Sequence, residues 1–176
     1  MTIAGFVLGI VATVLAAASL TWQVVARRSL RPTLTPIVGL LTPDGLVLHD
    51  AGRDVSESLA AAAGKLPSGP FFIGVNVVNT GRSPLRVARW AIRADPGGTS
   101  LLPVDPAIGG TKVPHEIPPG ASAIFFTELH RAHRFAEAAQ RVANQPPRIV
   151  LTVSTGDRSY ATNPVAPALF LLGSQT

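Results

Sequence analysis

Phe71 to Asn79, FFIGVNVVN, is the stretch of this chain that most strongly predicts a β-strand. It is rich in aromatic and β-branched side chains, which suit a pleated, half-buried surface. A second run, Leu85 to Arg93 (LRVARWAIR), follows after the breaker Ser83-Pro84. We expect the two runs to form the core of an antiparallel sheet. Period-two alternation then turns Ala88, Trp90 and Ile92 inward and Arg89 and Arg93 toward water.

Shorter runs on either side predict further strands at 34–41, 46–49, 121–127, 148–155 and 158–162. A helix near residues 128–143 is predicted because Leu129, Ala132, Ala136, Ala139 and Val142 or Ala143 recur at helical spacing. Residues 50–70 predict either a short helix capped by Asp54 or Ser56, or a loop. The run 101–114 predicts only an edge strand or a loop, and 168–172 predicts a last edge strand or a segment packed on the sheet.

About seven short strands with one inserted helix are typical of an immunoglobulin-like antiparallel β-sandwich. The cysteine and tryptophan signature of true immunoglobulin domains is missing, since the chain has no cysteine. We therefore expect a mainly β fold over residues 34–176. The absence of cysteine also excludes disulfides, thiol chemistry and cysteine-ligated metals.

The N-terminal part of the chain has a different composition. Thr2 to Ala26, TIAGFVLGIVATVLAAASLTWQVVA, contains no ionisable side chain. At 1.5 Å per residue it is long enough to cross a hydrocarbon core of about 30 Å. The alternative is a cleaved secretory signal with small residues at Ala16-Ala17-Ala18, but no basic residue precedes the apolar run. We expect a transmembrane anchor at 1–28 and a basic juxtamembrane linker at 29–33.

Basic residues on one side of the anchor predict its orientation. None precedes the apolar run, whereas Arg27, Arg28 and Arg31 follow it closely. Lysine and arginine are retained on the cytoplasmic side of a bilayer, and Trp22 suits the interface there. The prediction is a single-pass membrane protein with its domain in the cytoplasm.

Small residues line one face of the predicted anchor. Gly5, Gly9, Thr13 and Ala17 are spaced four residues apart, and Thr21 continues the series. Such a face lets a second helix approach closely in lipid. It predicts a homodimer or a higher homo-oligomer through the anchor.

The charge of the chain argues against nucleic acid as a partner. Lysine and arginine number 15 against 10 acidic residues, a formal net charge of +5. Three of those charges belong to Arg27, Arg28 and Arg31, which leaves a net charge of +2 for the rest of the chain. The basic excess therefore favours contact with a lipid bilayer.

Candidate chemical groups are few. His130, His133 and Glu137 could approach one face of the predicted helix as metal ligands, but Arg131 and Arg134 place opposing charge beside them. A nucleophile elbow and a P-loop are both missing from the sequence. We expect no enzyme activity, no catalytic residue, no metal and no cofactor.

Two groups of arginines are candidates for contact with a protein partner or with lipid. Arg82 and Arg86 flank the turn after the first strong strand. Arg131, Arg134 and Arg141 lie on the predicted helix, where an ordinary solvated face is the plainer interpretation.

Several of these segments resemble a loose family of uncharacterised, single-pass bacterial membrane proteins. The resemblance rests on the end of the anchor (WQVVARRS, 22–29), on VNVVNTGRSP (75–84) with Val87 and Trp90, and on IPPGASA (117–123). It implies the β-sandwich and a tether in the bacterial inner membrane, and it implies no activity. Residues 50–69 and 128–143 have no counterpart in it.

The function that these features predict is a membrane-anchored, non-enzymatic module that binds or scaffolds an unknown protein partner. Exposed strand edges and loops would supply its contacts. The alternative is a structural subunit of a larger membrane complex or filament in which the N-terminal helices pack together.

Overall fold

The structure, a computed structural model, describes residues 12–22, 32–65, 70–103, 110–143 and 145–174. Residues 12–22 are helical and exposed. Within the described ranges, no helix has both the length and the apolar character that a membrane span requires. Residues 1–11 and 23–28 of the expected anchor lie outside the described residues, so the anchor stays a prediction.

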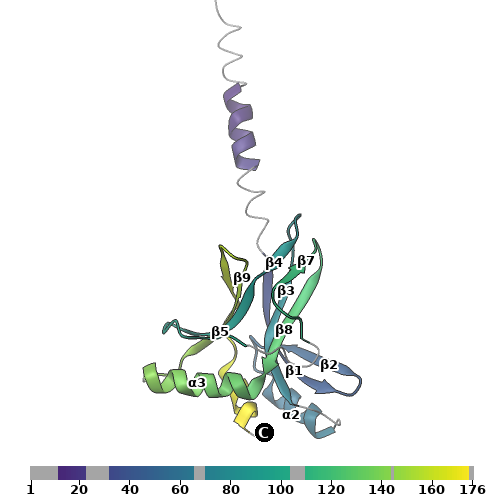
Figure 1. The fold of residues 1–176 in the computed structure, drawn as a ribbon, viewed down its shortest axis with the longest axis vertical. Helices are drawn as coiled ribbons and strands as arrows, with labels where there is room; N and C mark the ends of the chain where they lie inside the picture. Colours follow the sequence, from purple (N-terminus) through teal and green to yellow (C-terminus); the bar gives the residue numbers. More distant parts are fainter. Residues whose placement is uncertain (1–11, 23–31, 66–69, 104–109, 144, 175–176) are drawn as a thin grey trace, which may run out of the picture.

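Two four-stranded sheets form the β domain, and every strand pair in it is antiparallel (Figure 1). The first sheet has the order β2-β1-β3-β8, with β1 at Thr33–Thr42, β2 at Gly45–Asp50, β3 at Phe71–Val78 and β8 at Ser122–Glu128. The second has the order β10-β9-β5-β6, with β5 at Arg89–Asp95, β6 at Ser100–Leu101, β9 at Arg148–Ser154 and β10 at Ser159–Ala161. A small third sheet pairs β4 (Leu85–Val87) with β7 (His115–Ile117). The prediction of a mainly β, antiparallel fold is confirmed.

The expected pairing of the two strongest strand segments is wrong. Residues 85–93 do not form one strand, because the chain leaves β4 after Val87 and enters β5 at Arg89. Between them, the Ala88 N–H donates to the Ser154 carbonyl oxygen (2.8 Å) at the end of β9. β3 and β5 consequently belong to different sheets. Alternating hydrophobicity cannot distinguish two strands that pair within one sheet from two strands that face each other across the core. Both arrangements bury the same kind of surface.

The hydrophobic core lies between the two main sheets. Its largest fully buried side chains come from both: Val38, Ile73, Val75, Val77 and Phe125 from the first sheet, Ile92 and Leu151 from the second. Trp90 and Ile92 point inward as predicted, whereas Ala88 is exposed. Two sheets that share one core are the arrangement of a β-sandwich.

Glycine is required at one position in this packing. Gly74 of β3 is paired with Phe126 of β8, and Phe126 packs edge-on against Phe72 with ring centroids 5.2 Å apart. A Cβ at Gly74 would collide with the Phe125 carbonyl oxygen and with the backbone of Phe126. The close approach of β3 and β8 therefore depends on the missing side chain.

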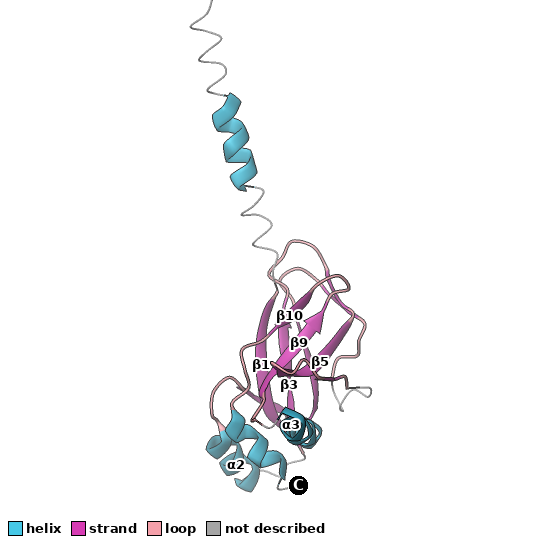
Figure 2. Cartoon of the chain, turned by 90° about the vertical axis from the view of Figure 1, so that its left-hand side faces the viewer, coloured by secondary structure: helices cyan, strands magenta, loops and turns pink. Residues whose placement is uncertain are grey.

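The helices that follow β1 in the chain gather at one end of the sandwich (Figure 2). α2 (Ser56–Lys65) begins where Asp54 Oδ1 accepts hydrogen bonds from the Ser56 N–H (3.1 Å) and hydroxyl (2.6 Å), so the predicted short helix is confirmed. α3 (Leu129–Ala143) follows β8 directly and buries Leu129, Ala132 and Ala139. Its last turn departs from the prediction, because Val142 is 86 % exposed.

The C-terminal segment packs against α3 and α2 rather than against a sheet edge. Residues 168–172 lie in η1 (Pro167–Ser174), a 3₁₀ helix that buries Leu169 and Leu172. The edge-strand prediction for this segment is wrong, whereas its burial is as expected. β7 is a second departure, since no strand is predicted between residue 114 and the strand at 121–127.

Candidate functional site

The chain enters the β domain at one end of the sandwich, which we call the tether end. β1 begins there, paired with the end of β3, and the helices lie at the opposite end, the helix end (Figures 1 and 2). The loop 79–84, the corner 117–121, the β4–β7 pair and the hairpin turn 155–158 make up the tether end.

Asn79 holds the loops of the tether end together and is only 3 % exposed. Its side-chain amide N–H groups donate to the carbonyl oxygens of Ser83 (2.9 Å) and Ile117 (2.8 Å). Its Oδ1 accepts from the Gly81 N–H (3.0 Å), which is the turn predicted from the sequence. Its backbone N–H donates to the Ala121 carbonyl oxygen (2.9 Å), and its carbonyl oxygen accepts from the Gly120 N–H (2.8 Å). The loop 79–84 is therefore held against the corner 117–121.

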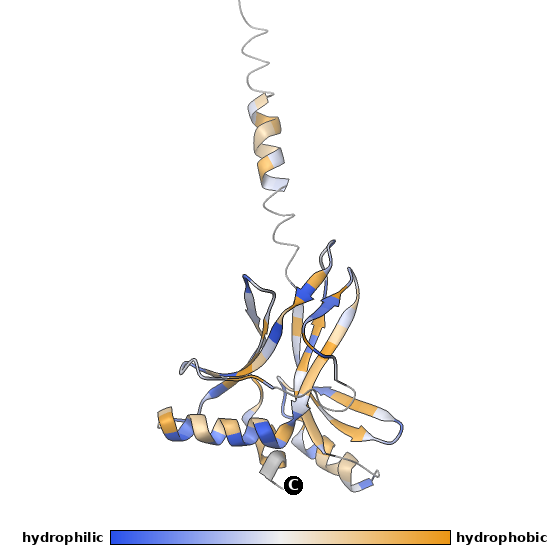
Figure 3. Cartoon of the chain, viewed as in Figure 1, coloured by the Kyte–Doolittle hydropathy of each residue, from blue (hydrophilic) through white to orange (hydrophobic). Residues whose placement is uncertain are grey.

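Arginines from several segments meet at the tether end. Arg82 and Arg86 come from the loop after β3 and from β4, and they are exposed. Arg89 starts β5, and its register partner Ser154 ends β9, so Arg89 lies at the same end of the second sheet. Arg158 follows the β9–β10 turn and approaches Asp157 at 3.8 Å. Figure 3 shows hydrophilic segments at this end of the domain.

A groove of about 780 Å³ opens between β1 and β10, beside the tether end. Its lining comes from both main sheets: Pro32, Leu34, Arg158, Ser159, Tyr160 and Ala161. β2 pairs with β1 only from Ile37 onward, so the start of β1 is an open edge of the first sheet. The groove lies between this edge and β10, which is the edge of the second sheet.

Both walls of this groove present backbone groups that pair with no strand in the described part of the chain. The Pro36 carbonyl oxygen accepts from the Ala51 N–H (2.9 Å) on the β2 side, so by alternation Leu34 turns its N–H and C=O toward the groove. On β10, the Thr162 N–H donates to the Leu151 carbonyl oxygen (2.9 Å) on the β9 side. Backbone groups alternate sides along a strand, so Ser159 and Ala161, at odd distances from Thr162, turn theirs away from β9 and toward the outside. Each wall is thus a strand edge open to pairing.

The arginines of α3 lie at the helix end, apart from Arg82 and Arg86. Glu128 pairs with Arg131 (3.6 Å) and His130 (3.2 Å), and Glu137 lies 3.8 Å from Arg141. Arg134 is exposed and makes no ion pair with any described residue. The structure therefore separates the two groups of arginines that the sequence analysis singled out.

The histidines of α3 do not converge on a common point. His133 Nε2 lies 3.3 Å from Glu137 Oε1, whereas His130 Nδ1 is directed at Glu128. Throughout the part of the chain that the structure describes, no three histidine or acidic side chains are grouped as metal ligands would be.

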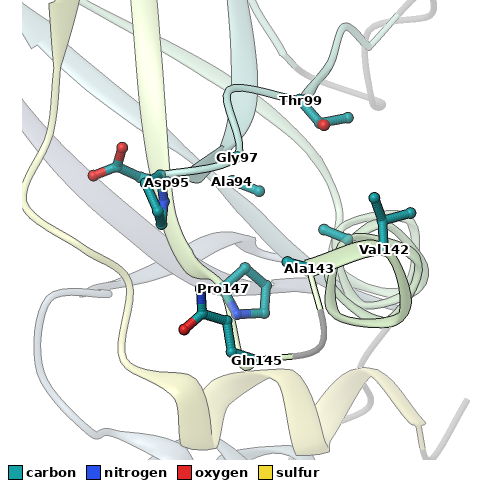
Figure 4. Close-up of a pocket in the computed structure, with 10 residues that line it drawn as sticks. Ala94, Asp95, Gly97, Thr99, Val142, Ala143, Gln145 and Pro147 are labelled. Atoms are coloured by element: carbon teal, nitrogen blue, oxygen red, sulfur yellow. The ribbon is translucent and has the colours of Figure 1, made fainter.

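A smaller, mostly apolar cavity of about 330 Å³ lies between the β5–β6 turn and the last turn of α3 (Figure 4). Gly97 and Thr99 face Val142 and Ala143 across it, and Asp95 directs its carboxylate away from α3. That carboxylate lies 3.6 Å from Arg93. The cavity thus offers a ligand little beyond apolar contact.

The predicted anchor residues are divided between described and undescribed parts of the chain. Gly5, Gly9, Arg27, Arg28 and Arg31 lie outside the described residues. Thr13, Ala17 and Trp22 lie on the exposed helical segment 12–22, where the Thr21 hydroxyl donates to the Ala17 carbonyl oxygen (2.8 Å).

Sequence reasoning missed the groove and two of the four arginines at the tether end. Arg158 had one local signal, since it directly follows Gly156-Asp157, a pair of residues typical of a turn. The open edges of Leu34, Ser159 and Ala161 had none, because strand order is a property of the whole fold.

Comparison of the chain with protein-family models, with curated proteins and with solved structures finds no match.

Proposed function

We propose that this protein is a membrane-anchored, non-enzymatic interaction module that binds a protein partner along the open strand edges of its β domain. The observation that carries the proposal is the groove of about 780 Å³ whose two walls, β1 and β10, present unpaired backbone groups. An extended peptide can add to such an edge as a new strand, with main-chain hydrogen bonds supplying affinity.

The groove suits an extended segment in shape and chemistry. Ser159 and Ala161 offer two outward N–H and C=O pairs on β10, and Leu34 offers a third on β1. Tyr160 and Leu34 are half-buried and provide apolar contact for alternate side chains of the peptide. Because β10 is short and offers few hydrogen bonds by itself, a docked strand would gain affinity from pairing with both walls.

The membrane anchor at 1–28 is part of the proposal. It is supported by the helical segment 12–22, whose large apolar side chains, Val14, Leu15, Leu20 and Trp22, are exposed. Water solvates such a surface poorly, so lipid or another protein must cover it. With Arg27, Arg28 and Arg31 after the anchor, the domain lies in the cytoplasm of a bacterial cell.

The fold proposed for the domain is the immunoglobulin-like sandwich, in keeping with the resemblance to single-pass bacterial membrane proteins. Support comes from the two antiparallel four-stranded sheets that share one core.

A photocrosslinking amino acid at position 159 of the full-length chain, in intact cells, tests the strand-edge proposal. We expect a covalent adduct with a partner protein, and we expect Ala161→Pro to reduce its yield about tenfold or more because proline removes an outward N–H. Ala161→Val keeps that N–H and serves as the matched control. Equal yields from the two variants would overturn the proposal.

The second candidate is an assembly subunit, favoured by the exposed small residues Thr13 and Ala17 on the segment 12–22. It predicts a large homo-oligomer in mild detergent and an adduct of twice the chain mass in the crosslinking experiment. The interaction module predicts a monomer or dimer. Protease accessibility in intact against lysed spheroplasts tests the orientation of either.

A further inference from the structure

We infer that the tether end of the β domain docks on anionic phospholipid headgroups through Arg82, Arg86, Arg89 and Arg158. This inference rests on the membrane anchor of the proposed function and adds the orientation of the domain on the bilayer. Its first support is the gathering of the four side chains at one end from separate parts of the chain.

Charge at the tether end is poorly compensated. Arg82, Arg86 and Arg89 make no ion pair with any described residue. Arg158 and Asp157 are 69 % and 82 % exposed and only 3.8 Å apart at closest, a pair that water screens strongly. Glu116, the register partner of Arg86, is the second carboxylate at this end. Among these described residues, four arginines therefore lie beside two carboxylates.

Arginines on α3, at the helix end, are paired with carboxylates to a greater extent. Two of the three arginines of α3, Arg131 and Arg141, lie within 4 Å of a glutamate one turn away, whereas one of the four arginines at the tether end, Arg158, lies that close to a carboxylate. A larger share of the arginines is thus unpaired at the end where the chain enters than on α3.

The arginines at the tether end are held on a rigid base. The five hydrogen bonds of the buried Asn79 fix the loop that carries Arg82 against the corner 117–121. Arg86 and Arg89 stand on strands, and Arg158 closes a two-strand hairpin. Docking therefore needs little ordering of the backbone, which is the main cost of binding through flexible loops.

Chain length places this surface beside the headgroups. If the anchor ends at Arg28, three residues separate it from Pro32, and the four extended Cα-to-Cα steps from Arg28 to Pro32 span at most about 14 Å. The headgroup region is itself several ångströms thick on each side of the hydrocarbon core. Anionic lipid is consequently the charged partner that the tether holds closest to these arginines.

This orientation would turn α3 and the other helices away from the bilayer and open the groove between β1 and β10 to the side. A partner peptide could then reach the groove without leaving the membrane surface.

Fluorescence quenching in vesicles tests the inference, and the absence of cysteine makes single-site labelling straightforward. The full-length chain with Ser83→Cys carries a fluorophore at the tether end, and the same chain with Gln140→Cys carries one on exposed α3. Each is reconstituted in phosphatidylcholine alone or with phosphatidylglycerol, together with a headgroup-attached quencher. We expect stronger quenching at position 83 in the anionic vesicles, reversed by salt, and little change at position 140.

Charge removal provides the matched comparison. Combined Arg82→Gln, Arg86→Gln and Arg158→Gln should lower the ratio of docked to undocked domain about a hundredfold, taking roughly fivefold for each charge. Combined Arg131→Gln, Arg134→Gln and Arg141→Gln removes the same charge at the helix end and should leave quenching at position 83 unchanged.

The outcomes separate this inference from the proposed anchor. A chain that fails to float with neutral vesicles refutes the anchor. A chain that floats but shows equal quenching at position 83 in neutral and anionic vesicles refutes the docking alone, and so does an equal effect of the two triple variants. The comparison of lipids and salt uses no charge variant, so it decides the question even if a triple variant does not fold.

Discussion

The side-chain amide of Asn79 donates a hydrogen bond to the carbonyl oxygen of Ile117, 38 residues further along the chain, at 2.8 Å. This contact joins the loop after β3 to the corner after β7. It is a buried polar link in a region built from turns, and the tether end depends on it for its shape.

Replacing Asn79 with alanine should therefore destabilise the domain. The substitution leaves the Ile117 and Ser83 carbonyl oxygens and the Gly81 N–H without their partner. We expect the free energy of unfolding, measured in urea, to fall by about 2–3 kcal/mol. Asn163→Ala, at an exposed asparagine, is the control and should change it by less than about 0.5 kcal/mol. Similar values for the two variants would contradict the role given to Asn79.

Two glycine substitutions should have opposite signs. Gly74→Ala places a methyl group against the Phe125 carbonyl oxygen, so we expect a loss of at least about 2 kcal/mol from overpacking. Gly64→Ala lies in α2 with open space around it, and alanine should stabilise the helix by about 0.5–1 kcal/mol. Thermal unfolding of both variants checks this, and a destabilised Gly64→Ala protein would be the contrary result.

Leu169 and Leu171 of η1 should respond differently to the same change. Leu169 is fully buried, whereas Leu171 is 68 % exposed. Leu169→Ala should cost about 2–5 kcal/mol through the cavity it leaves, and Leu171→Ala less than about 1 kcal/mol. Equal losses in the free energy of unfolding, measured in urea, would show that η1 does not pack as described.

The pKa of Asp54 should lie below its ordinary value of 3.8, first because the Ser56 hydroxyl and then because the Ser56 N–H donates to the carboxylate. A lowered folded-state pKa means that the ionised form favours folding, so this contribution is present above about pH 4 and is lost as the pH falls through the folded value. Ser56→Ala removes the larger cause and should move the pKa part of the way back. A carboxyl carbon NMR titration of both proteins measures it, and an unchanged pKa in the variant would refute the assignment.

Local features of the fold were predictable because their causes lie within a few residues. The strand 71–78, the helix α3 and the turns at Gly45, Gly120 and Gly156, all with positive φ, follow from side-chain type and turn chemistry. The Asp54 cap of α2 is of the same kind. Arg82 and Arg86 could be singled out because they flank such a turn.

Features that depend on distant partners were not predictable. The break at Ala88 follows from the Ser154 carbonyl oxygen that its N–H meets, and β7 exists because β4 lies beside it. Val142 has helical spacing yet is exposed, since the last turn of α3 extends past the surface that buries Ala139. In each case the distant segment that causes the feature cannot be identified from the local sequence.

The sequence by itself determined the apolar N-terminal run, the alternation of strands and turns, the lack of cysteine and the surplus of arginine after the apolar run, because each of these is a property of residues close together in the chain. Only the tertiary structure decided which strands share a sheet, where two strand edges are left open, and that Arg89 and Arg158 join Arg82 and Arg86 at the end where the chain enters. The physical reason is that strand order and the meeting of loops depend on how both sheets together bury one core, and many orders satisfy the same local pattern.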